Sequence, residues 1–358
     1  NRNFVSVPYW QLHITLKQGE AYRLFIHPEH FGDKKAAETA YGRIIPGSAV
    51  TITKVERGTV FQQAPLLYDL TSLQKDCNIH HDLTADKTLS IAQSLYEKKL
   101  VSYPRTGSRY IPEDVMANIP ALLEKIIAMP LFREYGRTFD FSALNTRSVD
   151  TTKVTDHHAV IPTRNLQGAD LTGLPMGEKA VLELVALRLL CAVAQPYTFA
   201  ETAVVVECAG AEFTAKGRTV KNHGWRALDA AYRAELKNVE QDKETEDKAL
   251  PELSEGQTLP LSGAAVKEGK TTPPKHFTED TLLSAMETAG KDDTPEDAER
   301  KGLGTPATRA GILEKLVSTG FLERKKSKKT VQLMPSHDAV SLITVLPEQL
   351  QSPLLTAE

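Results

Sequence analysis

Hydrophobic and polar residues alternate along the first part of the chain, a pattern typical of β-strands. In residues 4–16 (FVSVPYWQLHITL) polar and apolar side chains alternate from Gln11 to Leu16, and residues 21–27 and 49–58 are also rich in aromatic and β-branched residues. Successive side chains of a strand point to opposite faces, so the alternation predicts strands with one buried face. The first part of the chain is therefore expected to be mainly β-structure.

Between residues 65 and 196 the spacing of the apolar residues becomes helical. Residues 85–100 carry an apolar side chain every three or four positions, and Thr84 directly before them can cap a helix. Residues 112–128 begin with a proline followed by two acidic residues, which suit the first turn of a helix. Residues 178–194 are apolar nearly all round, which predicts a buried helix.

Strand patterns return after this helical block, over residues 201–208, 212–217 and 259–269. An acidic stretch with few aromatic residues, 239–256, separates the last two and predicts a solvated loop. Strand patterns on both sides of a helical block indicate one β domain into which a helical domain is inserted.

The C-terminal part predicts two capped helices followed by a hairpin. Thr278 can cap a helix over residues 279–289, and Thr305 can cap one over 307–319. Two short strands then surround the basic tip 324–329, RKKSKK. Helix, helix and basic hairpin form the outline of a winged helix, which places a helix and a wing near a nucleic-acid backbone. A solvated turn remains the alternative for the tip.

With 358 residues the chain exceeds the usual size of one domain, so two or three domains are expected. The patterns predict an α+β multidomain fold with a discontinuous β-rich domain formed by residues 1–64 and 197–270. A mainly helical domain over residues 65–196 interrupts it, and residues 271–358 form a third part.

The composition excludes several classes of protein. No apolar run reaches the ~18 residues that span a membrane, and the first residues do not resemble a secretion signal. We therefore expect a cytoplasmic location without membrane association. The net charge is −3, so any basic surface for nucleic acid must be local. Cys77, Cys191 and Cys208 lack C-x-x-C spacing, which predicts reduced, buried thiols rather than a zinc ribbon.

The stretch SYPRTGSR, residues 102–109, places Tyr103 beside four cationic residues, Lys98, Lys99, Arg105 and Arg109. A phenol with its ordinary pKa near ~10 is a poor nucleophile at neutral pH. Neighbouring cations would stabilise a phenolate and would also neutralise a phosphodiester under attack. The stretch therefore fits phosphoryl transfer to tyrosine, although a tyrosine next to a proline is more often a packing residue.

Two further stretches could contact phosphate. In TDHHAVIPT, His157 or His158 could donate to a phosphate oxygen while Asp156 orients the ring, unless one histidine is simply exposed and the other packed. In GLGTPATRAGILEKL, two glycines precede a capped helix whose free N–H groups would attract an anion. Arg309, one turn into that helix, could reach the same anion or a neighbouring carboxylate.

Together these stretches resemble the type IA DNA topoisomerases, and most of all the bacterial topoisomerase III branch. YPRTGSRY resembles the active-site motif Y-P-R-[ST]-D-S-R-Y, and DHHAVIPT is similar to that branch's H-H-A-I-I-P-T. GLGTPATRAGILEKLVSTGFL resembles G-I-G-T-x-A-T-R-A-x-I-I-x-x-L with a later G-[FY]. PPKHFTEDTLLSAME and PLLYDLTSLQ also match, so five elements occur in family order between residue 65 and about residue 322.

The resemblance implies an ATP-independent isomerase that cuts one DNA strand, leaves a 5′-phosphotyrosine, passes another strand through the gap and reseals it. Tyr103 would be the nucleophile, Arg105 would stabilise the attacked phosphate, and His157 would contact DNA near the scissile bond. Thr308 and Arg309 would line the single-strand groove. Three further candidates for DNA binding lie in the same motifs: Ser102, Arg109 and His158.

The resemblance also implies an architecture. The β-rich domain would be an arch, the winged-helix-like insertion would carry the tyrosine, and the C-terminal helices would belong to a base that lines the groove for single-stranded DNA. We expect a monomer.

The chain departs from the family pattern in two ways. Gly107 stands where the family usually has Asp. The family begins with a Toprim domain whose acidic D-x-D cluster binds Mg²⁺, and no D-x-D occurs in this chain. We therefore expect a fragment without its Toprim domain, with no metal ligands of its own and no activity in relaxation by itself.

Two other classes of protein are alternatives. A stand-alone, non-catalytic module could bind single-stranded DNA with the same arch. A relaxase-like nicking enzyme would need a metal held by two histidines that one apolar residue separates, whereas His157 and His158 are adjacent.

Overall fold

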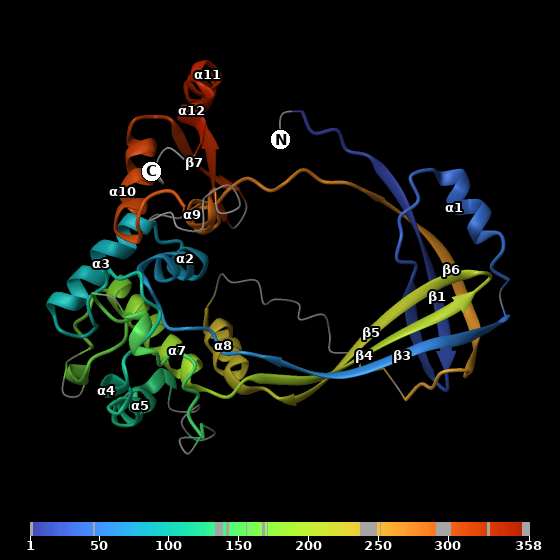
Figure 1. Cartoon of the computed structure of the whole chain (residues 1–358), viewed down its shortest axis with the longest axis horizontal. Coiled ribbons are helices and arrows are strands. Elements are labelled where there is room, and N and C mark those ends of the chain that lie inside the picture. The colour runs from blue at the N-terminus through green and yellow to red at the C-terminus, as the bar shows by residue number, and fades with distance from the viewer. Residues whose placement is uncertain are drawn as a thin grey trace. The chain divides into compact units, whose positions relative to one another are not determined.

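The computed structural model has mixed α and β content and divides into two compact units (Figure 1). Unit 1 comprises residues 1–62, 197–223 and 242–275, and unit 2 comprises 63–196, 224–241 and 276–358. The structure describes residues 3–45, 47–132, 139–140, 143–154, 156–166, 169, 171–236, 249–250, 252–290, 302–327 and 330–352. Most of the predicted acidic loop, 239–256, lies outside the described residues.

Unit 1 is a closed antiparallel barrel in the strand order β1-β2-β5-β4-β3-β6. Its strands are β1 (Pro8–Gln18), β2 (Ala21–Ile26), β3 (Ala49–Gln62), β4 (Tyr197–Cys208), β5 (Ala211–Asn222) and β6 (Thr258–Lys270). The alternation seen in the sequence places Leu12, Ile14 and Leu16 of β1 inside the barrel, each at most 1% exposed. Pairing of β1 with β6 closes the barrel. Helix α1 (Lys34–Tyr41), which begins after its cap Asp33, was not predicted.

Unit 2 is mainly helical. Its helices are α2 (Leu70–His81), α3 (Ala85–Glu97), α4 (Glu113–Met116), α5 (Ile119–Ala128), α7 (Met176–Val193), α8 (Gly224–Glu235), α9 (Glu279–Thr288), α10 (Pro306–Ser318), α11 (His337–Val345) and α12 (Glu348–Gln351). Short 3₁₀ turns lie at Pro130–Phe132, Thr151–Lys153 and Arg164–Leu166. Strands β7 (Leu322–Ser327) and β8 (Thr330–Pro335) form the predicted hairpin.

The predicted helix caps are confirmed. Thr84 accepts a hydrogen bond from the backbone N–H of Lys87 at 3.2 Å at the start of α3. Thr278 and Thr305 form capping boxes at the starts of α9 and α10. These short polar side chains satisfy backbone donors that no helical partner can reach, which explains why they mark helix starts so well.

The single helix expected over residues 112–128 is wrong, because the structure has two helices there, α4 and α5. Pro120 lies in the first turn of α5 and has no N–H to donate to the carbonyl of Met116, the last residue of α4. Pro112 also stands at the N-cap of α4, one position before the first-turn place that the sequence suggested.

Helix α8 lies where the sequence predicted only β-structure. Tyr232 and Leu228 on its inner face are buried, and α8 packs against α7. The apolar helix α7 is buried on nearly all sides, as predicted, and contacts α2, α3 and α8. Cys77, Cys191 and the barrel residue Cys208 are buried and carry free thiols, which confirms the expectation from their spacing.

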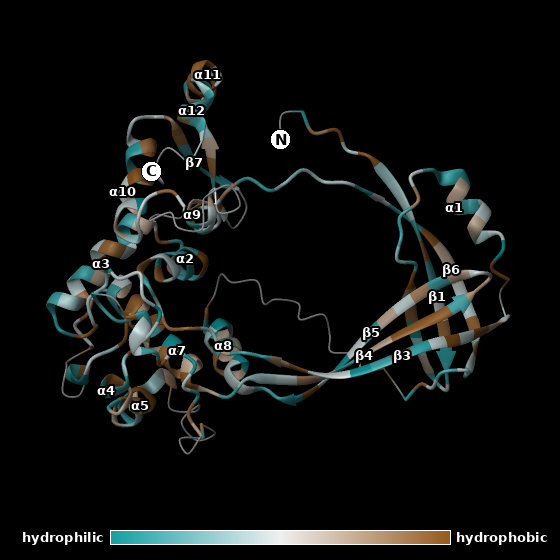
Figure 2. Ribbon diagram, viewed as in Figure 1, coloured by the Kyte–Doolittle hydropathy of each residue, from teal (hydrophilic) through white to brown (hydrophobic). Residues whose placement is uncertain are grey.

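Helix α11 presents an apolar surface. Leu342, Ile343 and Val345 are exposed, and Figure 2 shows brown, hydrophobic residues on this helix. Among the described residues, no helix combines the length and the apolar character that crossing a membrane would require.

Two half-buried histidines, His80 and His81 of α2, contact Tyr232 of α8 and predict a stability that depends on pH. The Nε2 atom of His81 lies 2.8 Å from the Tyr232 hydroxyl, and the His80 ring packs edge-on against the same ring at 6.0 Å. Burial lowers the pKa of both histidines below the ordinary value of about 6.5. Asp76 and Asp229 act in the opposite direction on His80.

Below about pH 6.5 the two histidines bind protons more readily in the unfolded chain than in the folded chain. Their contribution to the free energy of unfolding is therefore fully present above about pH 6.5 and falls as the pH drops below it. We expect the melting temperature to decrease between about pH 7.5 and about pH 5.5. His80→Gln should flatten this dependence, whereas His337→Gln, at a side chain that is 88% exposed, should leave it unchanged. Thermal unfolding followed by circular dichroism measures both, and equal slopes for the two variants would contradict the assignment.

Candidate active site around Tyr103

Hydrogen bonds fix the backbone around Tyr103. The Ser102 N–H donates to the Ile161 carbonyl at 2.9 Å. The Ser102 hydroxyl accepts from the Ile161 N–H and donates to the Ala159 carbonyl, both at 2.9 Å. The two stretches that sequence analysis singled out, around Tyr103 and around His157, are thus joined directly. Ser102 holds them together, and its assignment to DNA binding stays a prediction.

Thr106 makes a second connection between the same stretches. Its hydroxyl donates to the His157 carbonyl at 2.8 Å and accepts from the Ser108 N–H at 3.0 Å. The Thr106 carbonyl accepts from the Leu70 N–H at the start of α2. Tyr103 therefore stands on a loop tied both to the histidine stretch and to a helix end.

The Tyr103 ring is half-buried between two other rings. The His157 ring lies 4.3 Å away between centroids, at an angle of 44°, and the Tyr96 ring of α3 meets it edge-on at 5.4 Å. Within the described part of the chain, no hydrogen bond engages the Tyr103 hydroxyl. The ring is held by contacts along its body, which leaves its oxygen available for chemistry.

The two arginines of this loop have different surroundings. Arg105 is exposed and makes no hydrogen bond or ion pair through its guanidinium with any described residue. The Arg109 Nε atom lies 3.1 Å from Asp69 Oδ2, and Asp69 also caps α2. Of the two arginines, Arg105 therefore has no described partner, whereas Arg109 is held by an internal carboxylate.

Gly107 is not required by the backbone, because its φ angle is not positive and a Cβ there would meet only Pro306 Cγ, at an ordinary 3.6 Å. Nothing in the structure explains why glycine replaces the Asp usual in the family that the motif resembles.

The adjacent histidines differ in exposure, as the simpler interpretation of TDHHAVIPT expected. His157 is exposed, while His158 is half-buried with its Nδ1 atom 2.7 Å from the Ala159 carbonyl. The exposed His157 ring nevertheless contacts the Tyr103 ring, so His157 belongs to the candidate site. No hydrogen bond joins Asp156 to either imidazole in the described structure, so the orienting role suggested for it is not observed.

The Arg309 guanidinium is buried and binds neutral protein groups, and no ion pair joins it to a carboxylate of the described residues. Arg309 is 4% exposed, and its guanidinium donates to the Leu303 carbonyl and to the Thr71 hydroxyl, both at 3.1 Å. Thr308 is engaged in the capping box of α10. Arg309 connects α10 to α2, Thr308 satisfies the N-terminus of α10, and contact of either residue with DNA stays a prediction.

The glycine before α10 permits close approach of protein backbone. Gly302 has a φ of +88°, and a Cβ there would lie 2.6 Å from the carbonyl oxygens of Met286 and Glu287 at the end of α9. The close approach predicted from the glycines is therefore made, by the chain's own helix.

The basic tip carries less free charge than its sequence suggested. Arg324 makes ion pairs with Glu279 at 2.8 Å and Glu314 at 2.7 Å, so it ties β7 to α9 and α10. Lys325 and Lys326 are exposed, and residues 328–329 lie outside the described part of the structure.

The described residues do not fit a magnesium site. Among them, no three His, Cys, Asp or Glu side chains are grouped so that they could hold a metal ion.

A protein-family model described as DNA topoisomerase matches residues 1–358. This chain belongs to the DNA topoisomerase family. The chain is 35% identical to DNA topoisomerase 3 of Bacillus licheniformis over 375 residues, which cover 100% of this chain and 49% of the relative. It is 34% identical to DNA topoisomerase 3 of Vibrio cholerae, over 91% of this chain and 49% of the relative.

These relatives place the chain on the topoisomerase III side of the family, as the motifs indicated. The chain spans about half the length of the curated relatives it matches. Among solved structures, it is similar to full-length topoisomerase I from Thermotoga maritima, with a TM-score of 0.67 over 98% of this chain and 53% of that one. At 18% identity this likeness shows the fold, and it confirms the mixed α and β architecture.

Sequence analysis missed two contributors to the site. Tyr96 belongs to the residues at helical spacing in 85–100, and only its position in the last turn of α3 before the loop could have suggested contact with Tyr103. Asp69 precedes Ser72 by three residues, a spacing typical of a capping box, and this signal would have revealed α2.

Proposed function

We propose that this topoisomerase chain cleaves and reseals single-stranded DNA through Tyr103. The observation that carries the proposal is the phenol itself, whose ring is held by His157 and Tyr96 while its oxygen has no partner among the described residues. Arg105, two positions after Tyr103 in the sequence, is an exposed cation without an ion pair among the described residues, and it supports the proposal because a phosphodiester under attack needs a positive charge.

The proposed reaction exchanges one phosphoester for another. The Tyr103 oxygen attacks a backbone phosphorus, the bond from phosphorus to the 3′-oxygen breaks, and the proton lost from the phenol balances the proton gained by the departing 3′-oxygen. A 5′-phosphotyrosine and a free 3′-hydroxyl result, and the reverse attack reseals the strand. Because the phosphoester bond is conserved in the intermediate, resealing needs no ATP.

Arg105 and His157 have separate roles in this proposal. Arg105 places a fixed positive charge beside the phosphate, where negative charge grows in the transition state. The exposed His157 ring, stacked obliquely on Tyr103, positions the phenol and contacts the adjacent strand. Ser102, Thr308 and Arg309 act by shaping the backbone around that strand.

Removal of the Arg105 charge should slow cleavage without changing the fold. We expect Arg105→Gln to lower the rate of covalent adduct formation by about a hundredfold, the size of effect seen when one preorganised donor to a developing charge is lost. Arg43→Gln, at an exposed arginine of unit 1, is the matched control and should react normally. Equal rates for the two variants in a denaturing-gel assay would remove Arg105 from the mechanism.

We further propose that relaxation of supercoiled DNA requires the Mg²⁺-binding acidic cluster that the resemblance assigns to a Toprim domain. The purified chain with Mg²⁺ and negatively supercoiled plasmid should therefore show no relaxation on a gel. Robust relaxation would overturn this dependence. The cytoplasmic location and monomeric state inferred from the sequence stay predictions.

A further inference from the structure

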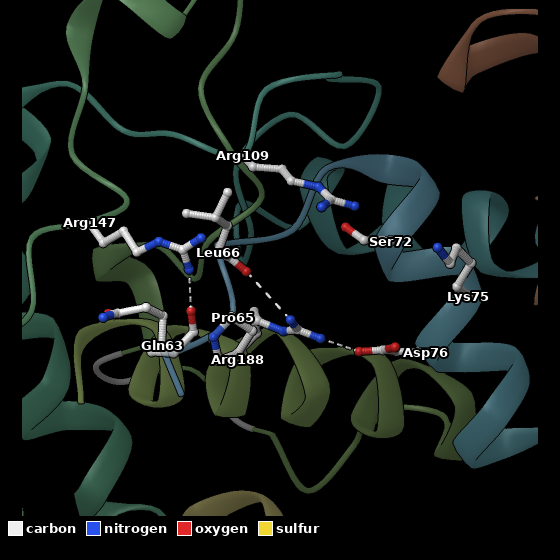
Figure 3. Close-up of a pocket in the computed structure, with 10 residues that line it drawn as sticks. Gln63, Pro65, Leu66, Ser72, Lys75, Asp76, Arg109, Arg147 and Arg188 are labelled. Atoms are coloured by element: carbon white, nitrogen blue, oxygen red, sulfur yellow. Dashed lines mark hydrogen bonds and ion pairs between the residues drawn. The ribbon is translucent and has the colours of Figure 1, made fainter. Parts of the chain in front are cut away.

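A cationic pocket lies in unit 2, and none of the candidate site residues except Arg109 takes part in it (Figure 3). Its volume is about 410 Å³. Its lining residues are Gln63, Ala64, Pro65, Leu66, Ser72, Lys75, Asp76, Arg109, Arg147 and Arg188. Four of these side chains are cationic, and Asp76 is the carboxylate among them.

One wall of the pocket is electrically neutral and firmly built. Arg188 forms an ion pair with Asp76, and its guanidinium lies over the Tyr68 ring at 4.2 Å from the centroid. The Tyr68 hydroxyl donates to the same carboxylate at 2.6 Å. The charge of Arg188 is therefore neutralised by Asp76, so Arg188 lines the pocket but does not give it a net positive charge.

The charge of Arg109 is also neutralised by a carboxylate, that of Asp69, which does not line the pocket. Its Nε atom pairs with Asp69, whose other oxygen accepts from the Ser72 N–H at 2.7 Å. Since the loop that carries Tyr103 supplies Arg109, this pair links the pocket to the candidate active site.

Lys75 and Arg147 remain without a carboxylate. Arg147 donates to the Ala64 carbonyl at 2.6 Å and makes no ion pair with a described residue. Lys75 has neither a hydrogen bond nor an ion pair among the described side chains. Figure 3 shows these two cations on opposite sides of the pocket. Two unpaired cations facing one cavity favour an anionic occupant.

We propose that this pocket holds one phosphate-bearing nucleotide of the single-stranded DNA that Tyr103 cleaves, a proposal that rests on the function proposed above. Lys75 and Arg147 contact the phosphate, and Arg147 offers a planar fork suited to two of its oxygens. The pocket is of the size that encloses a small organic ligand rather than a bare ion. Gln63 and the apolar Pro65 and Leu66 provide contacts for the sugar and base.

The first test compares two lysines of neighbouring helices. Lys75→Gln should weaken binding of a short labelled oligothymidylate by about tenfold at low salt, the usual effect of losing one charge-assisted contact. The slope of log affinity against log salt should become shallower by about 0.7. Lys87→Gln, at an exposed lysine of α3, removes the same charge and should change neither quantity. Fluorescence anisotropy measures both, and equal behaviour of the two variants would overturn the pocket.

A second pair of variants separates charge from shape. Arg147→Lys keeps the charge and should retain most of the affinity that Arg147→Gln loses, if phosphate is the ligand. Should Arg147→Gln fail to fold because the bond to Ala64 is lost, the Lys75 comparison still decides the matter. Equal affinities for wild type, Arg147→Lys and Arg147→Gln would contradict the proposal.

Competition identifies the occupant. Thymidine monophosphate should displace the oligonucleotide from the wild-type protein, and much less effectively from the Lys75→Gln variant. If Lys75→Gln alters the affinity for inorganic phosphate but not for the oligonucleotide, the pocket is a free-phosphate site and the strand assignment is wrong. A Tyr103 adduct that forms normally with unchanged binding in Lys75→Gln would overturn the pocket and leave the proposed function intact. Binding that depends on Lys75, in a protein that forms no Tyr103 adduct, would support the pocket and refute the cleavage.

Discussion

Tyr103→Phe should abolish covalent attachment of DNA in the active enzyme while leaving its fold and its binding of single strands unchanged. The substitution removes only the attacking oxygen, and that oxygen has no hydrogen bond among the described residues. The ring contacts with His157 and Tyr96 remain possible, so the stability should change by less than about 0.5 kcal/mol. Adduct formation should fall by about a thousandfold or more, because no neighbouring group replaces a lost nucleophile.

In the measurement, denaturant traps the covalent protein–DNA adduct, and the amount of adduct is quantified on a gel. Tyr22→Phe, at an exposed tyrosine of the barrel, is the matched control and should form the adduct at the normal rate. If Tyr103 were only a packing residue, Tyr103→Phe would retain the adduct and show at most a small change in stability. That outcome would end the proposed mechanism.

Arg188→Met should be among the most destabilising single changes in unit 2. It leaves Asp76 and the Tyr68 hydroxyl in a partly buried site without their cation, since the Arg188 and Asp76 side chains are only 19% and 22% exposed. Breaking a buried pair by removing one partner typically costs several kcal/mol, and we expect about 2–3 kcal/mol here because some exposure remains. Urea denaturation followed by circular dichroism measures the loss.

The barrel provides a matched comparison for this pair. Arg218 also lies over an aromatic ring, Phe199, and pairs with a carboxylate, Glu201, but the two charged side chains are 44% and 27% exposed. Arg218→Met should therefore cost less than about 1 kcal/mol. Adding Asp76→Asn to Arg188→Met should recover part of the stability by removing the isolated charge. Equal losses from Arg188→Met and Arg218→Met would show that burial of the pair does not matter.

Local signals in the sequence predicted most of the helix starts and strands. Thr84, Thr278 and Thr305 mark helix starts through hydrogen bonds that depend only on neighbouring residues. Helix α8 was missed although Trp225, Leu228 and Tyr232 have helical spacing, because the surrounding strand patterns dominated the interpretation. Closure of the barrel joins β1 to β6 across most of the chain, and local periodicity carries no information about such pairing.

The candidate site was only partly predictable for the same reason. The motifs named Tyr103 and His157, and the structure brings their rings together through Ser102 and Thr106. The burial of Arg309 could not be foreseen, because its partner Thr71 is 238 positions away in sequence. An arginine at a helix start looks alike whether it faces an anion or a distant hydroxyl.

The most direct test of the account is to identify the residue that becomes joined to DNA. Single-stranded DNA with a labelled phosphate is cleaved by the active enzyme, the adduct is trapped with denaturant and digested, and the labelled peptide is sequenced by mass spectrometry. The account predicts that the label lies on the peptide containing SYPRTGSR, at the oxygen of Tyr103. A label on any other residue, or a strand break without a covalent adduct, would contradict it.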